Sequence, residues 1–244
     1  MTYTLEHAHT RQAIRDRLAR GPSTNYLRDW IYGGVDGAIT TFAIVAGVAG
    51  ADLSVTVLLI LGFANLLADG FAMGASNFIA TKSERDDYER VLSIERRHIA
   101  VIPDGEREEI RQIFAAKGFA GDDLDRVVNV ITSDKNLWTK TMVTEEYGLS
   151  PTQKSPILSG FSTFIAFIFC GCIPLVSYLF TAKLGACVIA TGVTFFAVGA
   201  IKSRWSPVGW IRSSIETLII GMGAAALAFM VAFGLRALFN LSFV

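Results

Sequence analysis

Five long apolar stretches of the chain are each close to the length that a helix needs to cross a lipid bilayer. They cover residues 30–51, 53–81, 157–182, 184–201 and 217–235. A bilayer core of about 30 Å requires about 20 mostly apolar helical residues. The sequence therefore predicts an all-α, polytopic membrane protein with five transmembrane helices.

The charged residues are concentrated between the second and third stretches. Residues 82–154 hold 15 of the 22 acidic and 12 of the 22 basic residues, whereas only one acid, Glu216, follows Pro156. We expect this segment to be a water-soluble insert of three helices, at about 84–100, from an N-terminal cap at Asp104 to about 117, and from about 122 to 147. The expected domains are an N-terminal arm (1–29), transmembrane helices one and two (30–81), the acid-rich insert (82–154) and transmembrane helices three to five (155–244).

Lysine and arginine placement predicts the orientation of the chain. With five spans, one side of the membrane receives the N-terminal arm, the insert and the loop at 202–212. Outside the insert this side carries Arg11, Arg15, Arg17, Arg20, Arg28, Lys202, Arg204 and Arg212. The other side offers only Lys183 and Arg236 as flanking bases. The positive-inside rule then places the N-terminus and the insert in the cytosol and the C-terminus on the opposite side.

The composition and the N-terminal residues limit which partners and which cellular membrane are expected for the protein. The formal net charge of zero provides no basic excess, so a nucleic-acid partner is not expected. The first 29 residues are polar and are not followed by a short apolar run with a small-residue cleavage site, so a cleaved signal peptide is not expected. The compact length favours a bacterial inner membrane over a vacuolar membrane.

Two carboxylates and a methionine lie within the predicted spans. Asp36 is the only charged residue of the first stretch and Asp69 of the second, and Met73 follows Asp69 by one helical turn. An ionised Asp in hydrocarbon costs at least about 2.5–3.5 kcal/mol, so such residues usually line a transport path. The alternative is that each Asp is buried against backbone donors in a glycine-rich bundle.

Glycine pairs in the same two stretches have the spacing of helix contact motifs. Gly33 and Gly37 are four apart, as are Gly70 and Gly74. Small residues at this spacing allow two helices to approach closely. We expect the pairs to mediate contact between spans, within one chain or across a dimer.

Acidic, imidazole and thioether side chains recur at helical spacing in the insert. The pairs that share a helix face are Glu95 with His98, Glu106 with Glu109, and Met142 with Glu146. On facing helices this set suits a first-row divalent metal such as Fe²⁺, and the thioether disfavours Mg²⁺ and Ca²⁺. The alternative is a solvated face, because acids in the first turn of a helix are stabilised by its dipole without any ligand.

Three longer runs resemble a known family. They are DGAITTFAIVAGVAGA at 36–51, ANLLADGFAMG at 64–74 and ATKSERDDYER at 80–90, and they are similar to the vacuolar iron transporter family. The resemblance implies a transporter, not an enzyme, that has no prosthetic group and moves Fe²⁺ out of the cytosol as a homodimer in exchange for protons. It also assigns the membrane pathway to Asp36 and Met73.

The resemblance also implies the metal ligands of the insert. They fall on Glu95, Glu106, Glu109, Met142 and Glu146. Where the family usually has a second glutamate three residues after the first, this chain has His98, which still ligates Fe²⁺ when neutral but carries no negative charge.

The resulting hypothesis is a divalent-metal transporter whose insert captures the ion. Fe²⁺, Mn²⁺, Co²⁺ and Zn²⁺ all suit the ligand set. Its partners are then the metal ion, protons and the lipid bilayer. The competing interpretation is a membrane-tethered module that oxidises or senses a metal, with the spans as an anchor.

Overall fold

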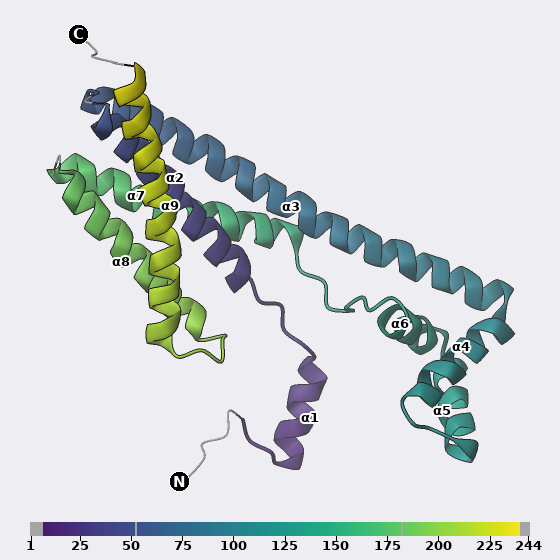
Figure 1. Ribbon diagram of the computed structural model, residues 1–244. Helices are drawn as coiled ribbons and strands as arrows, with labels where there is room; N and C mark the ends of the chain where they lie inside the picture. The colour runs from purple at the N-terminus through teal and green to yellow at the C-terminus, as the bar shows by residue number, and fades with distance from the viewer. Residues whose placement is uncertain (1–6, 52, 182, 240–244) are drawn as a thin grey trace. The chain divides into compact units, whose positions relative to one another are not determined.

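Helices account for all regular structure in the described part of the chain. In a computed structural model that describes residues 7–51, 53–181 and 183–239, the five long apolar helices are α2 (Leu27–Gly50), α3 (Val55–Val101), α7 (Pro156–Thr181), α8 (Leu184–Ser203) and α9 (Trp210–Phe239) (Figure 1). By length and composition each can cross a membrane. The shorter helices are α1 (Arg11–Arg20), α4 (Pro103–Ala116), α5 (Gly121–Ser133) and α6 (Lys135–Glu145). The predicted fold class is therefore confirmed.

The second span and the first insert helix are one continuous helix, α3, where the sequence had suggested two. The polar residues at 81–84 include no glycine or proline, so the change from apolar to charged side chains does not interrupt the backbone. The helix ends at Val101 because Pro103 disfavours helical backbone at Ile102, which has φ −132° and ψ 56°. Pro103 itself begins α4, so Asp104 lies in the first turn of α4 and is not its cap.

The third predicted insert helix is divided into α5 and α6 at Asp134. This residue has an extended backbone, with φ −117° and ψ 113°. Its Oδ1 accepts hydrogen bonds from the backbone N–H groups of Asn136 (2.8 Å) and Leu137 (3.3 Å), which is the geometry of a helix N-cap. The apolar pattern continues past Asp134, so the sequence pattern did not predict the break between α5 and α6.

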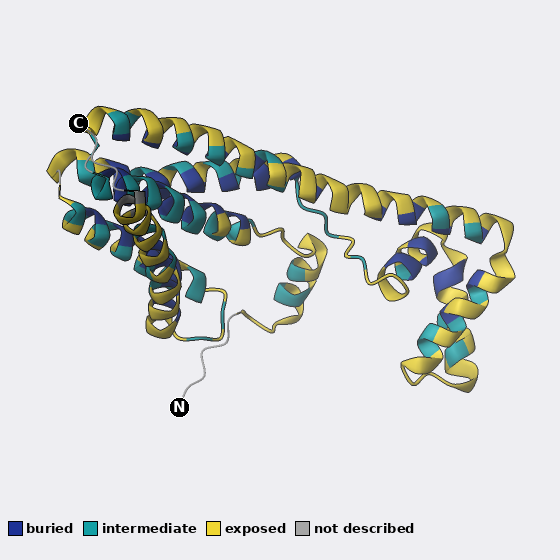
Figure 2. Ribbon diagram, turned by 45° about the horizontal axis from the view of Figure 1, so that its top comes forward, coloured by how far each residue is buried: buried dark blue, intermediate teal, exposed yellow. Residues whose placement is uncertain are grey.

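The described chain divides into two compact units. The first comprises the N-terminal segment up to Thr24 together with Lys82–Lys154. Its side chains pack into two buried clusters, one of which contains Ile99, Ile110, Val128, Ile131, Trp138 and Met142 and the other Tyr88, Val91, Leu92 and Val143. These clusters hold α4, α5, α6 and the C-terminal part of α3 together, and Figure 2 shows the buried positions on those helices.

The second unit, Asn25–Thr81 with the chain from Ser155 onward, is built around α2 and α7. A Cβ at Gly33 or Gly37 of α2 would collide with backbone carbonyl oxygens of α7. A Cβ at Gly70 of α3 would lie 3.0 Å from the Phe167 ring, and one at Gly74 would lie 2.9 Å from a backbone oxygen of α7. Both glycine pairs therefore mediate helix contacts within the chain.

Candidate metal centre

Two glutamates and a histidine of the insert come together at the junction of α3 and α4. Glu95 and His98 lie one turn apart on α3, and Glu106 lies in the first turn of α4, just after the bend at Pro103. Nδ1 of His98 is 3.3 Å from Oε1 of Glu106 and 3.8 Å from Oε1 of Glu95. One potential ligand atom from each residue lies within 4.8 Å of the other two, which is the spacing of a metal site.

The two carboxylates of this group are buried and incompletely hydrogen-bonded. Glu95 is 1% exposed and Glu106 is 5% exposed. On each of them Oε2 is buried without a hydrogen-bond partner among the described residues. Buried charged groups without partners cost several kcal/mol, about 1–3 kcal/mol or more for each unmade hydrogen bond. The oxygens therefore fit a cation better than they fit the protein alone.

Tyr147 supports Glu95 from the end of α6. Its hydroxyl donates a hydrogen bond of 3.0 Å to Oε1 of Glu95, from a position 52 residues away in sequence. Burial, together with the hydrogen bond to Glu95 and the charge of that residue, raises the pKa of Tyr147 to about 12. The phenol therefore keeps its proton at neutral pH and acts as a donor. Tyr147 was not predicted as a site residue, because a tyrosine after a helix-terminal acid has no distinctive pattern.

Glu109 and Glu146 share the electrostatic field of the cluster. Burial, and then the charges of Glu95 and Glu109, raise the pKa of Glu106 to about 7. Burial, Glu95 and Glu109 also raise the pKa of Glu146, while His98 lowers it. Glu109 and Glu146 are themselves exposed. The predicted acidic ligands thus form one interacting group with a buried centre and an exposed margin.

Met142, the sixth predicted ligand, lies in the apolar core of the insert. Its side chain is fully buried and packs in the cluster that includes Ile110 and Trp138. The Met142 carbonyl accepts a backbone hydrogen bond of 2.9 Å from the N–H of Glu146, which closes the last turn of α6. Its role as a thioether ligand stays a prediction.

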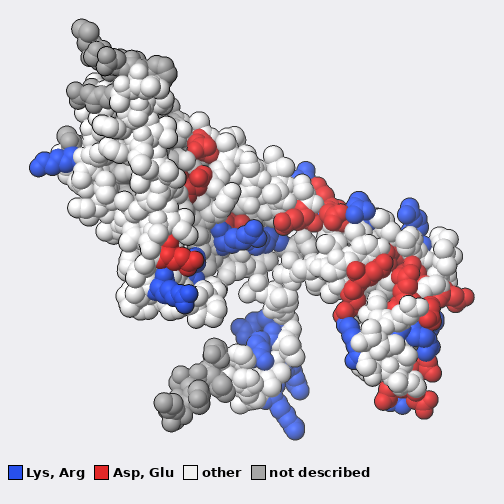
Figure 3. All heavy atoms as spheres, viewed as in Figure 1, with Lys and Arg blue, Asp and Glu red and all other residues white. Residues whose placement is uncertain are grey.

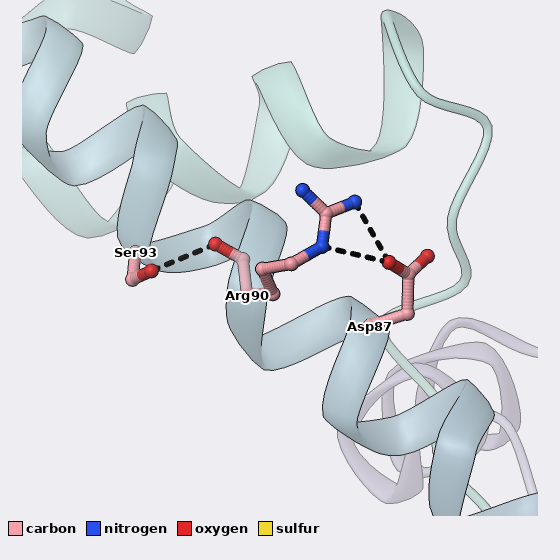
Figure 4. A network of polar contacts seen from close by, with 3 residues as sticks. All are labelled: Asp87, Arg90 and Ser93. Carbon is pink, nitrogen blue, oxygen red and sulfur yellow. Dashed lines mark hydrogen bonds and ion pairs between the residues drawn. The ribbon is translucent and has the colours of Figure 1, made fainter.

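Other acids of the insert have ordinary surface partners. Figure 3 shows Asp and Glu side chains gathered over the insert helices, but most of them lie outside the cluster. Asp87, for example, accepts two hydrogen bonds from the Arg90 guanidinium, at 2.8 and 3.0 Å, and Ser93 donates to the Arg90 carbonyl (Figure 4). Asp122 and Asp123 occupy the first turn of α5, where the helix dipole stabilises them.

The predicted membrane residues lie on the two helices expected. Asp36 is half-buried in the middle of α2, and Asp69 is half-buried on α3. Each is the only charged residue of its predicted apolar stretch. The Asp36 backbone carbonyl also accepts a hydrogen bond of 2.9 Å from Thr40 Oγ1. Met73 is half-buried one turn beyond Asp69 on α3.

A buried polar contact joins α2, α3 and α7 and was not predicted. Asp29 is 7% exposed, and Nδ2 of Asn77 donates to its Oδ1 at 3.1 Å. The same amide nitrogen lies 2.7 Å from Thr163 Oγ1 and 3.2 Å from the Ser159 carbonyl. The predicted N-terminal arm, residues 1–29, included Asp29. Because α2 begins at Leu27, Asp29 instead lies in its first turn.

Comparison with known proteins gives a consistent result over most of the chain. A sequence model described as the VIT family matches residues 27–233. "Vacuolar iron transporter 1" of Arabidopsis thaliana is 34% identical over 211 residues, which cover 84% of each chain. "Vacuolar iron transporter 2" of Oryza sativa subsp. japonica is 31% identical over 208 residues, 83% of this chain and 85% of the relative. "Vacuolar iron transporter" of Plasmodium berghei (strain Anka) is 27% identical over 238 residues, 92% of this chain and 87% of the relative.

Proposed function

The chain belongs to the VIT family, and from this membership we propose that it transports a divalent metal, principally Fe²⁺, out of the cytosol in exchange for protons. It is a multi-pass membrane protein by its five long apolar helices. Its relatives are named as iron transporters. The insert, residues 82–154, would capture the ion, and the spans within 30–81 and 155–244 would carry it across.

The cluster formed by buried Glu95, buried Glu106 and partly exposed His98 carries this proposal. It offers two carboxylates and an imidazole nitrogen within 4.8 Å of one another, a set that suits Fe²⁺, Mn²⁺, Co²⁺ and Zn²⁺. Unpartnered carboxylate oxygens point to a cation as the missing partner. Glu109 and Glu146 would add negative charge at the margin, where it attracts the incoming ion.

Asp36, Asp69 and Met73 would form the membrane part of the path. A carboxylate in a low-dielectric environment tends to be neutralised, either by a proton or by a divalent cation. Proton and metal occupancy would then exclude each other, which is the elementary requirement of an exchanger. Met73 would supply a soft sulfur ligand that favours transition metals over Mg²⁺.

The proposal also includes the orientation of the protein in the membrane, its oligomeric state and the membrane in which it lies. The basic flanks favour a cytosolic N-terminus and insert, and the family resemblance favours a homodimer. The bacterial inner membrane stays a prediction from the sequence, while the named relatives are vacuolar transporters of eukaryotes. Labelling of single cysteines from either side of sealed vesicles would test the orientation, and light scattering in detergent would test the dimer.

Transport into proteoliposomes tests the function directly. Fe²⁺ flux is measured with and without a pH gradient, with the insert facing the metal. The double variant Glu95→Gln/Glu106→Gln should lower flux at low metal concentration, and Asp36→Asn should abolish flux at every concentration. Glu108→Gln is the matched control, because Glu108 is an exposed acid of α4. Wild-type flux in the Asp36 variant would refute the membrane path, and wild-type flux in the double variant would refute the capture site.

The imidazole of His98 makes a further expectation about metal preference. A nitrogen ligand favours Zn²⁺ and Co²⁺ over Mn²⁺, whereas an all-carboxylate site favours harder ions. The ratio of Zn²⁺ to Mn²⁺ affinity, measured by competition with a fluorescent chelator, should fall in His98→Glu. An unchanged ratio would show that His98 does not ligate the metal.

The same preparations separate transport from the competing function. A tethered oxidising module would consume oxygen when Fe²⁺ is added to the full-length protein, without any need for a sealed vesicle. A transporter instead requires the sealed compartment and an intact Asp36.

A further inference from the structure

A pocket of about 500 Å³ lies at the end of the membrane unit where α2 begins and α8 ends. Every residue that lines it belongs to this unit, and none of them is a residue of the metal cluster. The lining residues that matter for its chemistry are Arg28, Lys202, Tyr32, Trp205, Leu27 and Ile31. This volume is large enough for a small molecule or for one part of a larger amphipathic molecule.

Two cations contribute to the lining. Arg28 is an exposed residue of the first turn of α2. Lys202 lies in the last turn of α8, and its Nζ forms an ion pair of 3.8 Å with Oε2 of Glu216, which leaves other N–H groups of the ammonium for an anion. Both therefore retain donors for an anion. An arginine fork and a lysine ammonium are the side chains that bind phosphate groups best.

The rest of the lining is aromatic and aliphatic. Trp205 is 59% exposed and Tyr32 is 65% exposed, and such side chains are enriched at the level of the lipid headgroups. Leu27 and Ile31 form an apolar wall one turn apart on α2. A free phosphate ion would gain nothing from this wall, whereas a phospholipid would place its glycerol and the start of an acyl chain there.

The geometry points to a binding site for one anionic glycerophospholipid, whose phosphate lies between Arg28 and Lys202. The pocket opens on the side of the membrane that receives the basic flanks of the chain, which is the cytosolic side in the predicted orientation. Cytosolic leaflets carry anionic lipids, and basic pockets between spans bind their headgroups. Lipid binding at this site does not depend on metal binding by the cluster or on the proposed transport function.

Lipid binding to the delipidated, full-length protein in detergent tests this site. The probes are phosphatidylglycerol, phosphatidylcholine with the same acyl chains, and inorganic phosphate, and the readouts are native mass spectrometry and the shift of the unfolding temperature. Phosphatidylglycerol should bind and stabilise the wild type more than phosphatidylcholine does. Each contact between a basic side chain and an anionic lipid contributes enough that losing one should weaken binding about 5-fold and losing both about 30-fold.

The variants are Arg28→Gln, Lys202→Gln and the double variant, with Lys183→Gln as a matched control at the other end of α8. The control should keep the wild-type affinity. If the double variant does not fold, each single Gln variant is compared with its charge-preserving counterpart, Arg28→Lys or Lys202→Arg, which should retain more affinity for phosphatidylglycerol. Unchanged affinity for phosphatidylglycerol in the Gln variants would overturn the site. Equal binding of phosphatidylcholine, or full competition by inorganic phosphate, would overturn its assignment to an anionic lipid.

Discussion

Glu106→Gln should flatten the pH dependence of the stability of the metal-free insert. Glu106 is buried in the first turn of α4, where its carboxylate faces Glu95 and shares the field of Glu109. Burial and these charges raise its pKa to about 7, from an ordinary value of 4.5. The glutamine variant has nearly the same shape but no proton to exchange.

The pKa shift gives the direction and the size of the effect. Between pH 4.5 and 7 the folded protein retains a proton on Glu106 that the unfolded chain has released, so the free energy of unfolding falls as the pH rises. One pKa unit corresponds to about 1.4 kcal/mol, so the loss across this window is about 3 kcal/mol. Below pH 4.5 both states are protonated, and well above pH 7 both are ionised, so the slope from Glu106 disappears at either end.

Urea unfolding of the full-length, metal-free protein measures this slope. Trp138 lies in the core of the insert and reports on it when the other three tryptophans are changed to Phe. The free energy of unfolding of the wild type should decrease from pH 4.5 to 7.5, while that of Glu106→Gln should change far less. Glu108→Gln, whose exposed carboxylate contacts Gln112 at 3.2 Å, should keep the wild-type slope. A wild-type slope in Glu106→Gln would refute the assignment of the titration to this residue.

Two further predictions concern single contacts. Tyr147→Phe removes the hydrogen-bond donor to Glu95, so the insert should lose about 1–3 kcal/mol of stability. The metal affinity should also fall about 10-fold or more. Competition with a chelator on the full chain measures the metal affinity, and an unchanged affinity would contradict the prediction. Gly37→Ala places a Cβ against the backbone carbonyl of Phe167 and should lower the unfolding temperature in detergent sharply, whereas Gly47→Ala, where nothing lies within 4 Å, should keep or raise it.

The spans could be predicted from sequence because one physical dimension fixes them. A bilayer sets the length of an apolar helix, so the composition alone locates the five stretches. Helix ends depend on single capping or helix-breaking residues, and the predicted ends were less accurate than the predicted spans. The continuity of α3 through Thr81 follows from the lack of any helix breaker, but a change in polarity suggested a boundary. The division at Asp134 rests on one cap side chain inside an otherwise helical pattern.

The candidate site was predictable where its members lie on one helix. Glu95 and His98 are three residues apart, so sequence spacing alone places them on one face. Glu106 lies close to them because the chain bends at Pro103, and the sequence alone predicts a helix break at this proline. Tyr147 and the contact between Asp29 and Asn77 depend on tertiary packing of segments 52 and 48 residues apart. No local pattern records such distances, and the sequence therefore could not identify these partners.

His98 gives the cluster less negative charge than the glutamate that the family resemblance implies at this position. Glu95 and Glu106 already face each other in a buried position, and Glu109 and Glu146 add negative charge nearby. A further carboxylate at position 98 would increase this repulsion in the metal-free protein, because like charges in a buried site destabilise each other. The imidazole avoids that cost, forms an ion pair from its Nδ1–H to Oε1 of Glu106 at 3.3 Å when protonated, and still offers a nitrogen to a metal when neutral. We therefore predict that histidine at position 98 lowers the affinity for hard cations, stabilises the metal-free site and favours later transition metals.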